Sequence, residues 1–281
     1  MKKKTKLIIV AVVVVIAVIA GSLGAYLGYF KPHKEAVDAY NVVVGDIQEK
    51  NDQLDGKIKK LQELVDNEDK PLDETTIDAA KEALKNAGAS EIVIEEMPKS
   101  TKDILSKTKE LSAPVDYSDE LTVLTTAYTN LENSKKQYKQ VVNPSEEFVM
   151  QRILTVDDVV DARAVTEDQD PNGNLYKAGG YTSTVYFESK NVDQGDIYVS
   201  GEYSDVLIDK GTDAGGAIEV YENVEDAEKR RDYLATYDGT TYANGTHTVI
   251  GTVLVRTSNK LTATQPKELE QKVIDALTRL E

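Results

Sequence analysis

Two stretches of this chain place apolar residues at alternating intervals of three and four, and no other feature constrains the fold as strongly. The first stretch, seam 1, comprises Val37, Tyr40, Val44, Ile47, Asn51, Leu54, Ile58, Leu61 and Val65. The second, seam 2, comprises Leu121, Leu124, Tyr128, Leu131, Lys135, Tyr138 and Val142. This spacing keeps a narrow apolar strip on one side of a helix. The sequence therefore predicts two long helices, each of which needs a partner.

Each seam can serve as the partner of the other, which favours an antiparallel helical hairpin, or coiled coil, over residues 32–142. The alternative is a parallel dimer of two chains through seam 1. The polar seam residues Asn51 and Lys135 are expected to fix the register. Residues 67–113, between the seams, are expected to form a smaller helical insert, with one helix ending at Gly88 and a second over residues 101–111.

The first 30 residues have the composition of a membrane anchor. Lysines occupy positions 2, 3, 4 and 6, and residues 7–30 carry no charged side chain. At ~1.5 Å per residue, a helix of this length exceeds the ~30 Å hydrocarbon core of a bilayer. We predict a cytoplasmic tail over residues 1–6, a transmembrane helix over residues 7–30, and a single-pass cell-membrane protein with its N-terminus inside and its C-terminal bulk extracytoplasmic. The alternative is a signal peptide cleaved near residues 20–22.

Gly24 and Gly28 form a pair of small residues four positions apart within the predicted span. Such a pair lets two spanning helices approach closely, so a homodimer through Gly24 and Gly28 is one prediction. The alternative is the ordinary content of small residues in a spanning helix.

The charge balance restricts the partners. The chain has 33 basic and 49 acidic residues, for a net charge of −16. Because this charge repels phosphate backbones, we expect no nucleic-acid binding. It suits a cation such as Ca²⁺. The sequence has no cysteine, which excludes disulfides and a lipoprotein anchor. We expect two partners: the membrane, and an envelope or extracellular protein that the sequence does not identify.

Residues 143–281 are predicted to form a separate α+β domain. Strand patterns cover residues 159–165, 181–187, 217–221 and 248–256, and a further short strand is considered around residues 197–199. Helix starts are indicated by Asn143 with Pro144, by Asn223, and by Thr262 with Gln265. The predicted fold class is thus an N-terminal transmembrane helix, an antiparallel helical hairpin, and a C-terminal α+β domain with a mainly antiparallel sheet in the order αβββαβα.

Three runs in this domain carry a resemblance: TEDQDPNGNLYKAGGYT at residues 166–182, GGAIEVYENVEDAEKRRDYL at 215–234, and GTVLVRTSNKLT at 251–262. They resemble a family of uncharacterised extracytoplasmic proteins of Gram-positive bacteria, which are membrane-anchored or lipid-anchored and are sometimes loosely labelled EbhA-like adhesins. The resemblance covers roughly residues 145–281. It implies a location in the cell envelope, and it implies no reaction.

The first of these runs also has the front half of a calcium loop. Asp168, Asp170 and Asn172 place oxygens at positions one, three and five, Gly173 allows a sharp bend, and Asn174 offers a carbonyl. The twelfth position, which is normally a bidentate glutamate, is glycine in this chain. A weak Ca²⁺ site is therefore one hypothesis, and a polar hairpin turn is the other.

Catalytic motifs are scarce. The sequence contains no GxSxG, HExxH or GxxxxGK[ST] motif, and its histidines are His33 and His247. Arg230, Arg231 and Arg256 are considered as partners for the acids of the 166–170 turn, or as solvent-facing pairs. We therefore expect a non-enzymatic interaction or sensing module on a helical stalk. The alternative is an envelope hydrolase that uses carboxylates, with or without a metal.

Overall fold

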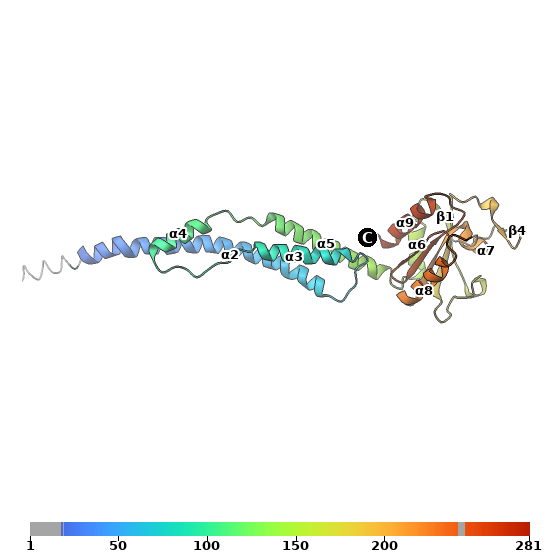
Figure 1. The fold of residues 1–281 in the computed structure, drawn as a ribbon, viewed down its shortest axis with the longest axis horizontal. Helices are drawn as coiled ribbons and strands as arrows, with labels where there is room; N and C mark the ends of the chain where they lie inside the picture. The colour runs from blue at the N-terminus through green and yellow to red at the C-terminus, as the bar shows by residue number, and fades with distance from the viewer. Residues whose placement is uncertain (1–17, 19, 241–244) are drawn as a thin grey trace, which may run out of the picture. The chain divides into compact units, whose positions relative to one another are not determined.

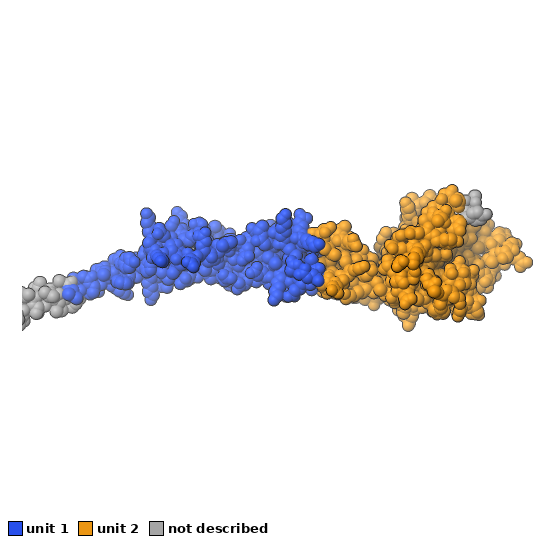
Figure 2. Space-filling view, turned by 60° about the horizontal axis from the view of Figure 1, so that its bottom comes forward, with its two compact units in different colours: residues 1–66, 79–128 blue, residues 67–78, 129–281 orange. Residues whose placement is uncertain are grey.

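The computed structural model describes residue 18, residues 20–240 and residues 245–281. The chain folds into two compact units, coloured separately in Figure 2. The helical unit comprises residues 1–66 and 79–128, and the sheet unit comprises residues 67–78 and 129–281. The division falls within two helices, so that each of these helices contributes to both units.

The described part of the N-terminal half of the chain is mainly helical (Figure 1). Its elements are the π-helix η1 (Tyr26–Phe30), α2 (Lys31–Asp66), α3 (Thr75–Ser90), α4 (Thr101–Leu111) and α5 (Ser118–Gln140). The helix predicted over residues 101–111 is confirmed. Ser100 caps it by accepting a hydrogen bond from the backbone N–H of Asp103 at 3.2 Å. The helix expected to stop at Gly88 continues two residues further, to Ser90.

The two seams lie on the buried sides of α2 and α5, as their spacing predicts. The buried members of seam 1 are Tyr40, Ile47, Asn51, Leu54 and Leu61, and those of seam 2 are Leu124, Leu131 and Lys135. The other members of both seams are partly buried. Helices with a single apolar strip at this spacing pack like those of a coiled coil. The helical region is accordingly coiled-coil-like.

A closed ring of hydrogen bonds fixes the register inside the helical unit. The Asn51 side chain donates from Nδ2 to the carbonyl of Ile92 at 2.8 Å, and its Oδ1 accepts from the hydroxyl of Tyr117 at 2.8 Å. The same hydroxyl accepts from the backbone N–H of Ile92 at 3.0 Å. A buried polar group without a hydrogen-bond partner would lower the free energy of unfolding. The ring therefore favours the one alignment in which the segments around Asn51, Ile92 and Tyr117 satisfy each other.

The antiparallel hairpin predicted between the seams is wrong, because α5 runs in the same direction as α2. Tyr117, just before α5, lies at the level of Asn51. Further along both helices, Leu124 and Tyr128 line one hollow together with Lys57 and Lys60. The seams therefore run parallel within one chain, an arrangement that requires a long return connection between them.

Helix α3 and then residues 91–99 provide that return, antiparallel to α2. The carbonyl of Glu95 accepts a hydrogen bond from the hydroxyl of Tyr40 at 3.1 Å, and Thr101 Oγ1 lies 2.9 Å from His33 Nδ1. From there α4 turns back along α2, and Ile104 is buried against Ala36 and Tyr40. The insert thus carries the chain back toward the start of α2 before α5 begins.

The membrane-spanning part of the predicted fold class is also corrected. Among the described residues, no helix combines the length and the apolar character needed to cross a bilayer. Residues 1–17 and 19, which include half of the predicted span, lie outside the described residues. The described chain is a mixture of helices and a five-stranded antiparallel sheet, and it does not support the transmembrane helix predicted over residues 7–30.

The sheet unit is built on five antiparallel strands in the spatial order β1-β2-β5-β7-β6. These are β1 (Val159–Ala164), β2 (Tyr181–Ser189), β5 (Gly215–Tyr221), β6 (His247–Ile250) and β7 (Val253–Thr257). The single strand predicted over residues 248–256 is a hairpin of two strands. Gly251 makes its turn with φ +57°, and a Cβ there would lie 2.5 Å from the carbonyl oxygen of Val141. This close approach requires glycine.

Helices cover both faces of the sheet (Figure 1). They are α6 (Glu146–Ile153), α8 (Val224–Ala235) and α9 (Gln265–Thr278). On one face, Val149 and Ile153 of α6 and Val273 of α9 share a core with Ile218 of β5. On the other face, the apolar side of α8 packs on Tyr181, Tyr221 and Leu254. The α+β architecture with an antiparallel sheet is therefore confirmed.

Helix caps in this unit agree with the sequence in one case, agree in part in a second, and differ in a third. Asn223 caps α8 by accepting from the backbone N–H of Asp226 at 2.9 Å, as predicted. Ser145, and not Asn143, caps α6. Asn143 adopts φ +48° and donates its amide to the carbonyl of Glu222 instead. Helix α9 begins at Gln265, whose side chain accepts from the backbone N–H of Thr262 at 2.9 Å.

The smaller elements of the unit are the short helices η2 (Glu167–Gln169), η3 (Gln194–Asp196), α7 (Leu207–Lys210) and η4 (Gly211–Ala214). A separate two-stranded hairpin consists of β3 (Tyr198–Val199) and β4 (Glu202–Tyr203). The short strand considered around residues 197–199 is confirmed.

The polar ring of the helical unit predicts the effect of one small substitution. Tyr117→Phe removes the hydroxyl that serves both Asn51 and the backbone of Ile92. Leaving these groups unpaired should destabilise the helical unit by about 1–3 kcal/mol, which denaturant unfolding followed by circular dichroism would measure. Tyr176→Phe is the control, because Tyr176 is 67% exposed in the sheet unit. If both variants unfold at the wild-type midpoint, the ring does not set the register.

Candidate functional site

The acidic turn, residues 166–181, connects β1 to β2 and is organised around Asp170. Asp170 Oδ2 accepts from the backbone N–H groups of Asn174 and Leu175, at 2.6 and 2.8 Å. Its Oδ1 accepts from the backbone N–H of Asn172 at 3.0 Å and from the hydroxyl of Tyr181 at 2.5 Å. Both carboxylate oxygens are therefore engaged by donors of the same turn and of the strand that follows.

These donors set the protonation state of Asp170. Partial burial acts to raise the pKa of its carboxyl, but the four hydrogen bonds favour the charged form and the net pKa is lowered. In an irregular turn, backbone N–H groups lack the carbonyl partners that a helix or a sheet would give them. A carboxylate that accepts from these N–H groups takes the place of those carbonyls and holds the turn together. The hydrogen bonds to Asp170 thus account for the sharp bend of the acidic turn, and no bound ion is needed to explain it.

The structure places the four residues of the calcium hypothesis in different roles. Asp168 accepts from Thr166 Oγ1 at 2.7 Å. Asn172 donates its amide toward the hydroxyls of Tyr181 and Tyr186, at 3.4 and 3.3 Å. Asn174 contributes its backbone N–H to Asp170. Among the described residues, no group of three or more His, Cys, Asp or Glu side chains is arranged to hold a metal ion. Calcium binding by Asp168, Asp170, Asn172 and Asn174 stays a prediction.

A second polar cluster lies on the α8 face of the sheet, centred on Glu219. Its Oε1 lies 2.6 Å from Nη1 of Arg256 on β7, and its Oε2 accepts from the hydroxyl of Tyr221 at 2.7 Å. Arg230 of α8 approaches the same Oε2 with Nε, at 3.3 Å. The Glu219 side chain is only 1% exposed. One buried carboxylate therefore ties together two strands and the helix that covers them.

Strand alternation explains why this carboxylate points toward α8. The neighbours of Glu219 on β5, Ile218 and Val220, face the opposite side and belong to the core beneath α6 and α9. Side chains at successive positions of a strand point to opposite faces. Glu219 and Tyr221 consequently share the α8 face, where Arg230 meets them one turn after Ala227.

Two arginines decide the charge state of the Glu219 cluster. Burial acts to raise the pKa of the Glu219 carboxyl, but the guanidinium groups of Arg256 and Arg230 outweigh it, so the pKa is lowered. Burial, followed by the charge of Glu219, raises the pKa of the Tyr221 hydroxyl. The cluster is thus an ionised carboxylate between permanently charged arginines. A general acid would instead need a raised carboxyl pKa.

Tyrosines join the Glu219 cluster to the acidic turn. The rings of Tyr181 and Tyr221 meet edge to face, with centroids 6.2 Å apart. Tyr186 lies on the same sheet face and receives the amide of Asn172. Its burial raises the pKa of its hydroxyl to about 12. These hydroxyls remain protonated at physiological pH and act as hydrogen-bond donors or acceptors.

The arginine partners differ from the sequence expectation. Arg230 and Arg256, which the sequence offers as partners of the 166–170 acids, pair with Glu219 instead. Arg231 pairs with its helix neighbours Asp232 and Glu228. The sequence does carry a signal for Glu219 that the motif patterns miss: it is the one acid within the otherwise apolar strand Ala217–Tyr221. Such a buried charge requires a partner.

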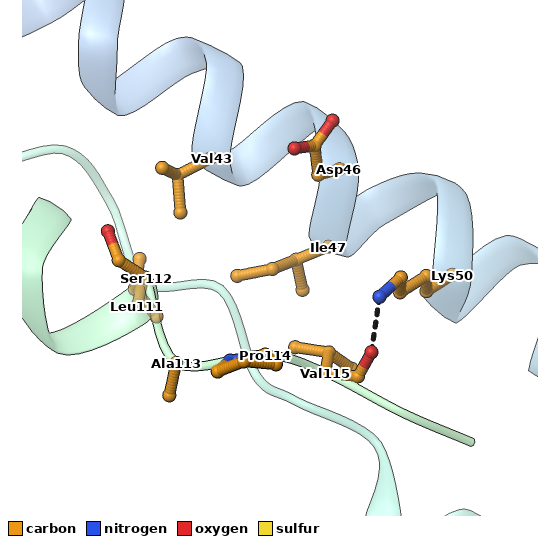
Figure 3. Close-up of a pocket in the computed structure, with 9 residues that line it drawn as sticks. All are labelled: Val43, Asp46, Ile47, Lys50, Leu111, Ser112, Ala113, Pro114 and Val115. Carbon is orange, nitrogen blue, oxygen red and sulfur yellow. Dashed lines mark hydrogen bonds between the residues drawn. The ribbon is translucent and has the colours of Figure 1, made fainter. Parts of the chain in front are cut away.

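One hollow of the described surface lies beside a buried part of seam 1. In the helical unit, a pocket of about 190 Å³ lies between α2 and the segment that joins α4 to α5. Figure 3 shows apolar side chains of Val43, Ile47 and Val115 around it, with the Lys50 ammonium turned toward the carbonyl of Val115, to which it donates. The lysine of this pocket is thus engaged, and the lining is mainly apolar, with Asp46 and Ser112 as its other polar side chains.

His247 starts β6, and within the described ranges no serine or threonine hydroxyl is hydrogen-bonded to its ring. Its Nε2 lies 3.5 Å from a carboxylate oxygen of Asp238, and in the sheet it pairs with Arg256. A histidine that activates a serine is instead hydrogen-bonded to the hydroxyl.

The chain matched no family model, no curated protein and no solved structure with which it was compared. Its function is therefore inferred from its own residues.

The Glu219 cluster predicts a pH-dependent stability. Since the folded-state pKa of Glu219 lies below the unfolded value of about 4.3, its stabilisation is present above that pH and is lost as the pH falls through the folded pKa. Glu219→Gln should lower the free energy of unfolding by about 3–5 kcal/mol at pH 7, because it leaves two buried guanidinium groups without their anion. The variant should also lose less stability than the wild type when the pH falls below about 4. Thermal unfolding between pH 2 and pH 7 would measure both effects.

Glu222→Gln is the matched control, since Glu222 directly follows β5 and its side chain is exposed. It should unfold like the wild type throughout this pH range. A Glu219→Gln protein with wild-type stability at pH 7 would show that the cluster does not hold the sheet and α8 together.

The acidic turn gives a prediction that separates its two explanations. If Asp170 holds the turn through backbone N–H groups, Asp170→Ala should destabilise the sheet unit by about 1–3 kcal/mol, and Asp168→Ala by much less. If the turn binds Ca²⁺ in the ~10⁻⁴–10⁻³ M range of extracellular modules, millimolar Ca²⁺ should raise the melting temperature of the wild type, and both variants should abolish the rise. Scanning calorimetry with Ca²⁺ and with chelator distinguishes the two.

Proposed function

We propose that this chain is a non-enzymatic extracytoplasmic module, carried by its coiled-coil-like helical region, that binds a partner in the cell envelope or outside the cell, or senses it. The observation that carries the proposal is the engagement of two inward-facing carboxylates, that of the partly buried Asp170 and that of the buried Glu219. Asp170 and Glu219 accept hydrogen bonds or ion pairs on both oxygens from groups of the protein itself. Neither has an oxygen left over for proton transfer to a substrate.

The runner-up is an envelope hydrolase that uses carboxylates. In such enzymes one carboxyl is kept protonated by a raised pKa while its neighbour stays ionised. The carboxyl groups with a shifted pKa among the described residues are all shifted downward: Asp69, Asp73, Asp116, Asp158, Asp170 and Glu219. This direction disfavours a general acid among them and supports the binding module.

The proposed location rests on the N-terminal residues. Four lysines precede an uncharged apolar run, and all of the acidic residues follow it. Near the end of that run, Leu23, Tyr26, Tyr29 and Phe30 each expose more than half of their surface. So much exposed apolar surface favours an environment other than water. These features support attachment at the cell membrane, with residues 32–281 outside the cytoplasm.

The location is tested with a membrane-impermeant protease on intact protoplasts that express the full chain. We expect removal of the fragment that contains residues 32–281, because the proposal places these residues outside the cytoplasm. A cytoplasmic protein of the same cells, measured in parallel, controls for lysis. Full protection of the chain under conditions in which lysed cells degrade it would place the bulk of it inside.

The choice between module and hydrolase is tested with the purified full chain and a washed envelope fraction. The proposal expects the chain to co-sediment with the envelope, at a saturable level, while mass spectrometry of the supernatant finds no released fragments. Carboxylate hydrolysis would instead release fragments with the wild type, and Glu219→Gln or Asp170→Asn would stop the release. That outcome, or the absence of saturable binding, would contradict the proposal.

A further inference from the structure

The hairpin formed by β3 and β4, residues 198–203, has an exposed aromatic face that the core of the sheet unit does not use. Its turn consists of Ser200 and Gly201, which have φ +55° and +87°. Two consecutive residues with positive φ form the tight turn that matches the twist of a two-residue hairpin. Figure 1 shows β4 at the periphery of the sheet unit, beyond α7. We call residues 198–203 the tyrosine hairpin.

The base of the tyrosine hairpin is buried in the core, whereas its two tyrosines are more than half exposed. Ile197, just before it, is 2% exposed, and Leu207, just after it, is 6% exposed, both within the main core. Tyr198 and Tyr203 are 65% and 53% exposed. They are direct cross-strand partners, so their rings leave the same face with Cβ atoms about 5 Å apart. An aromatic pair held by buried anchors but left in solvent is a preformed contact surface.

The surroundings of this pair are acidic. Between Glu188 and Asp213 the chain has seven acids and two lysines. Glu202 and Asp205 flank Tyr203 and are exposed. Both lysines are already engaged: Lys190 pairs with Asp158 at 2.9 Å, and Lys210 donates to Gln194 at 3.3 Å. The acids around the tyrosines therefore exceed the cations available to them.

One ring of the aromatic pair already makes a cation–π contact with a lysine of the same chain. The ammonium of Lys210 lies 5.9 Å from the centroid of the Tyr203 ring. This distance is within the range at which a lysine is attracted by the negative face of an aromatic ring. The chain thus already places one lysine of its own against this surface.

We propose that the tyrosine hairpin binds a lysine-rich or arginine-rich segment of a partner protein. The aromatic pair supplies two ring faces for the cations, and Glu202 and Asp205 supply the opposite charge. A cationic chain is the occupant that matches both features, whereas a neutral ligand would use only the rings. The proposal rests on the proposed function as an interaction module and names the surface and the class of partner.

The test uses hexalysine as the probe, with the full chain and titration calorimetry at 150 mM NaCl. Tyr198→Ser/Tyr203→Ser should weaken hexalysine binding roughly fivefold to thirtyfold, since it removes two cation–ring contacts. Glu202→Gln/Asp205→Asn should weaken it as well, and more at low salt. Tyr176→Ser is the matched control, because Tyr176 is 67% exposed on the acidic turn of the same unit. It should bind hexalysine like the wild type.

The other occupants are outcomes of the same experiment. Equal hexalysine affinity for the wild type and Tyr198→Ser/Tyr203→Ser would show that only the diffuse negative charge of the chain attracts the peptide, and it would overturn the proposal. Tyrosine-dependent binding of an N-acetylglucosamine hexamer without hexalysine binding would make the hairpin a carbohydrate surface and would overturn it too. Either failure leaves the envelope co-sedimentation result untouched, so the proposed function is judged separately.

Discussion

The ion cluster around Glu219 is the interaction on which the sheet unit depends. A carboxylate at the centre of a sheet would be expensive to bury alone, and here it is placed between Arg256 of β7 and Arg230 of α8. The cluster links elements whose apolar contacts alone are modest, because α8 presents few buried apolar side chains, Ala227 and Leu234. Electrostatic pairing therefore positions the helix that covers this face.

The acidic turn follows the same rule on a smaller scale. Asp170 is partly buried, and its charged carboxylate is stabilised by backbone and tyrosine donors instead of arginines. In a chain with 49 acidic residues, these two carboxylates are turned inward and serve the fold. The remaining acids are mostly exposed, where they shape the potential that a partner meets. This division between structural and surface acids supports a binding role over a catalytic one.

Local patterns in the sequence predict local structure well here, and long-range pairing less well. Seam spacing and the Asn223 cap depend on neighbours within a few residues, so they are readable from the sequence. The direction of α5 is not, because an apolar seam fits a parallel or an antiparallel partner equally, and the ring joining Asn51, Tyr117 and Ile92 decides between them. The split of residues 248–256 into two strands follows from the approach of Val141 to Gly251, a contact between distant segments.

The candidate site shows the same limit. The acidic turn and its bend are readable from the sequence, yet the four donors to Asp170 and the pairing of Glu219 with both arginines are properties of the assembled sheet. The structural role of the Glu219 cluster therefore depends on the charge state of one group. Carbon-13 NMR titration of the Glu219 carboxyl in the full chain measures it directly. We predict a pKa below the value of about 4.3 for a free glutamate. A pKa above about 6, in the range of a general acid, would contradict this role.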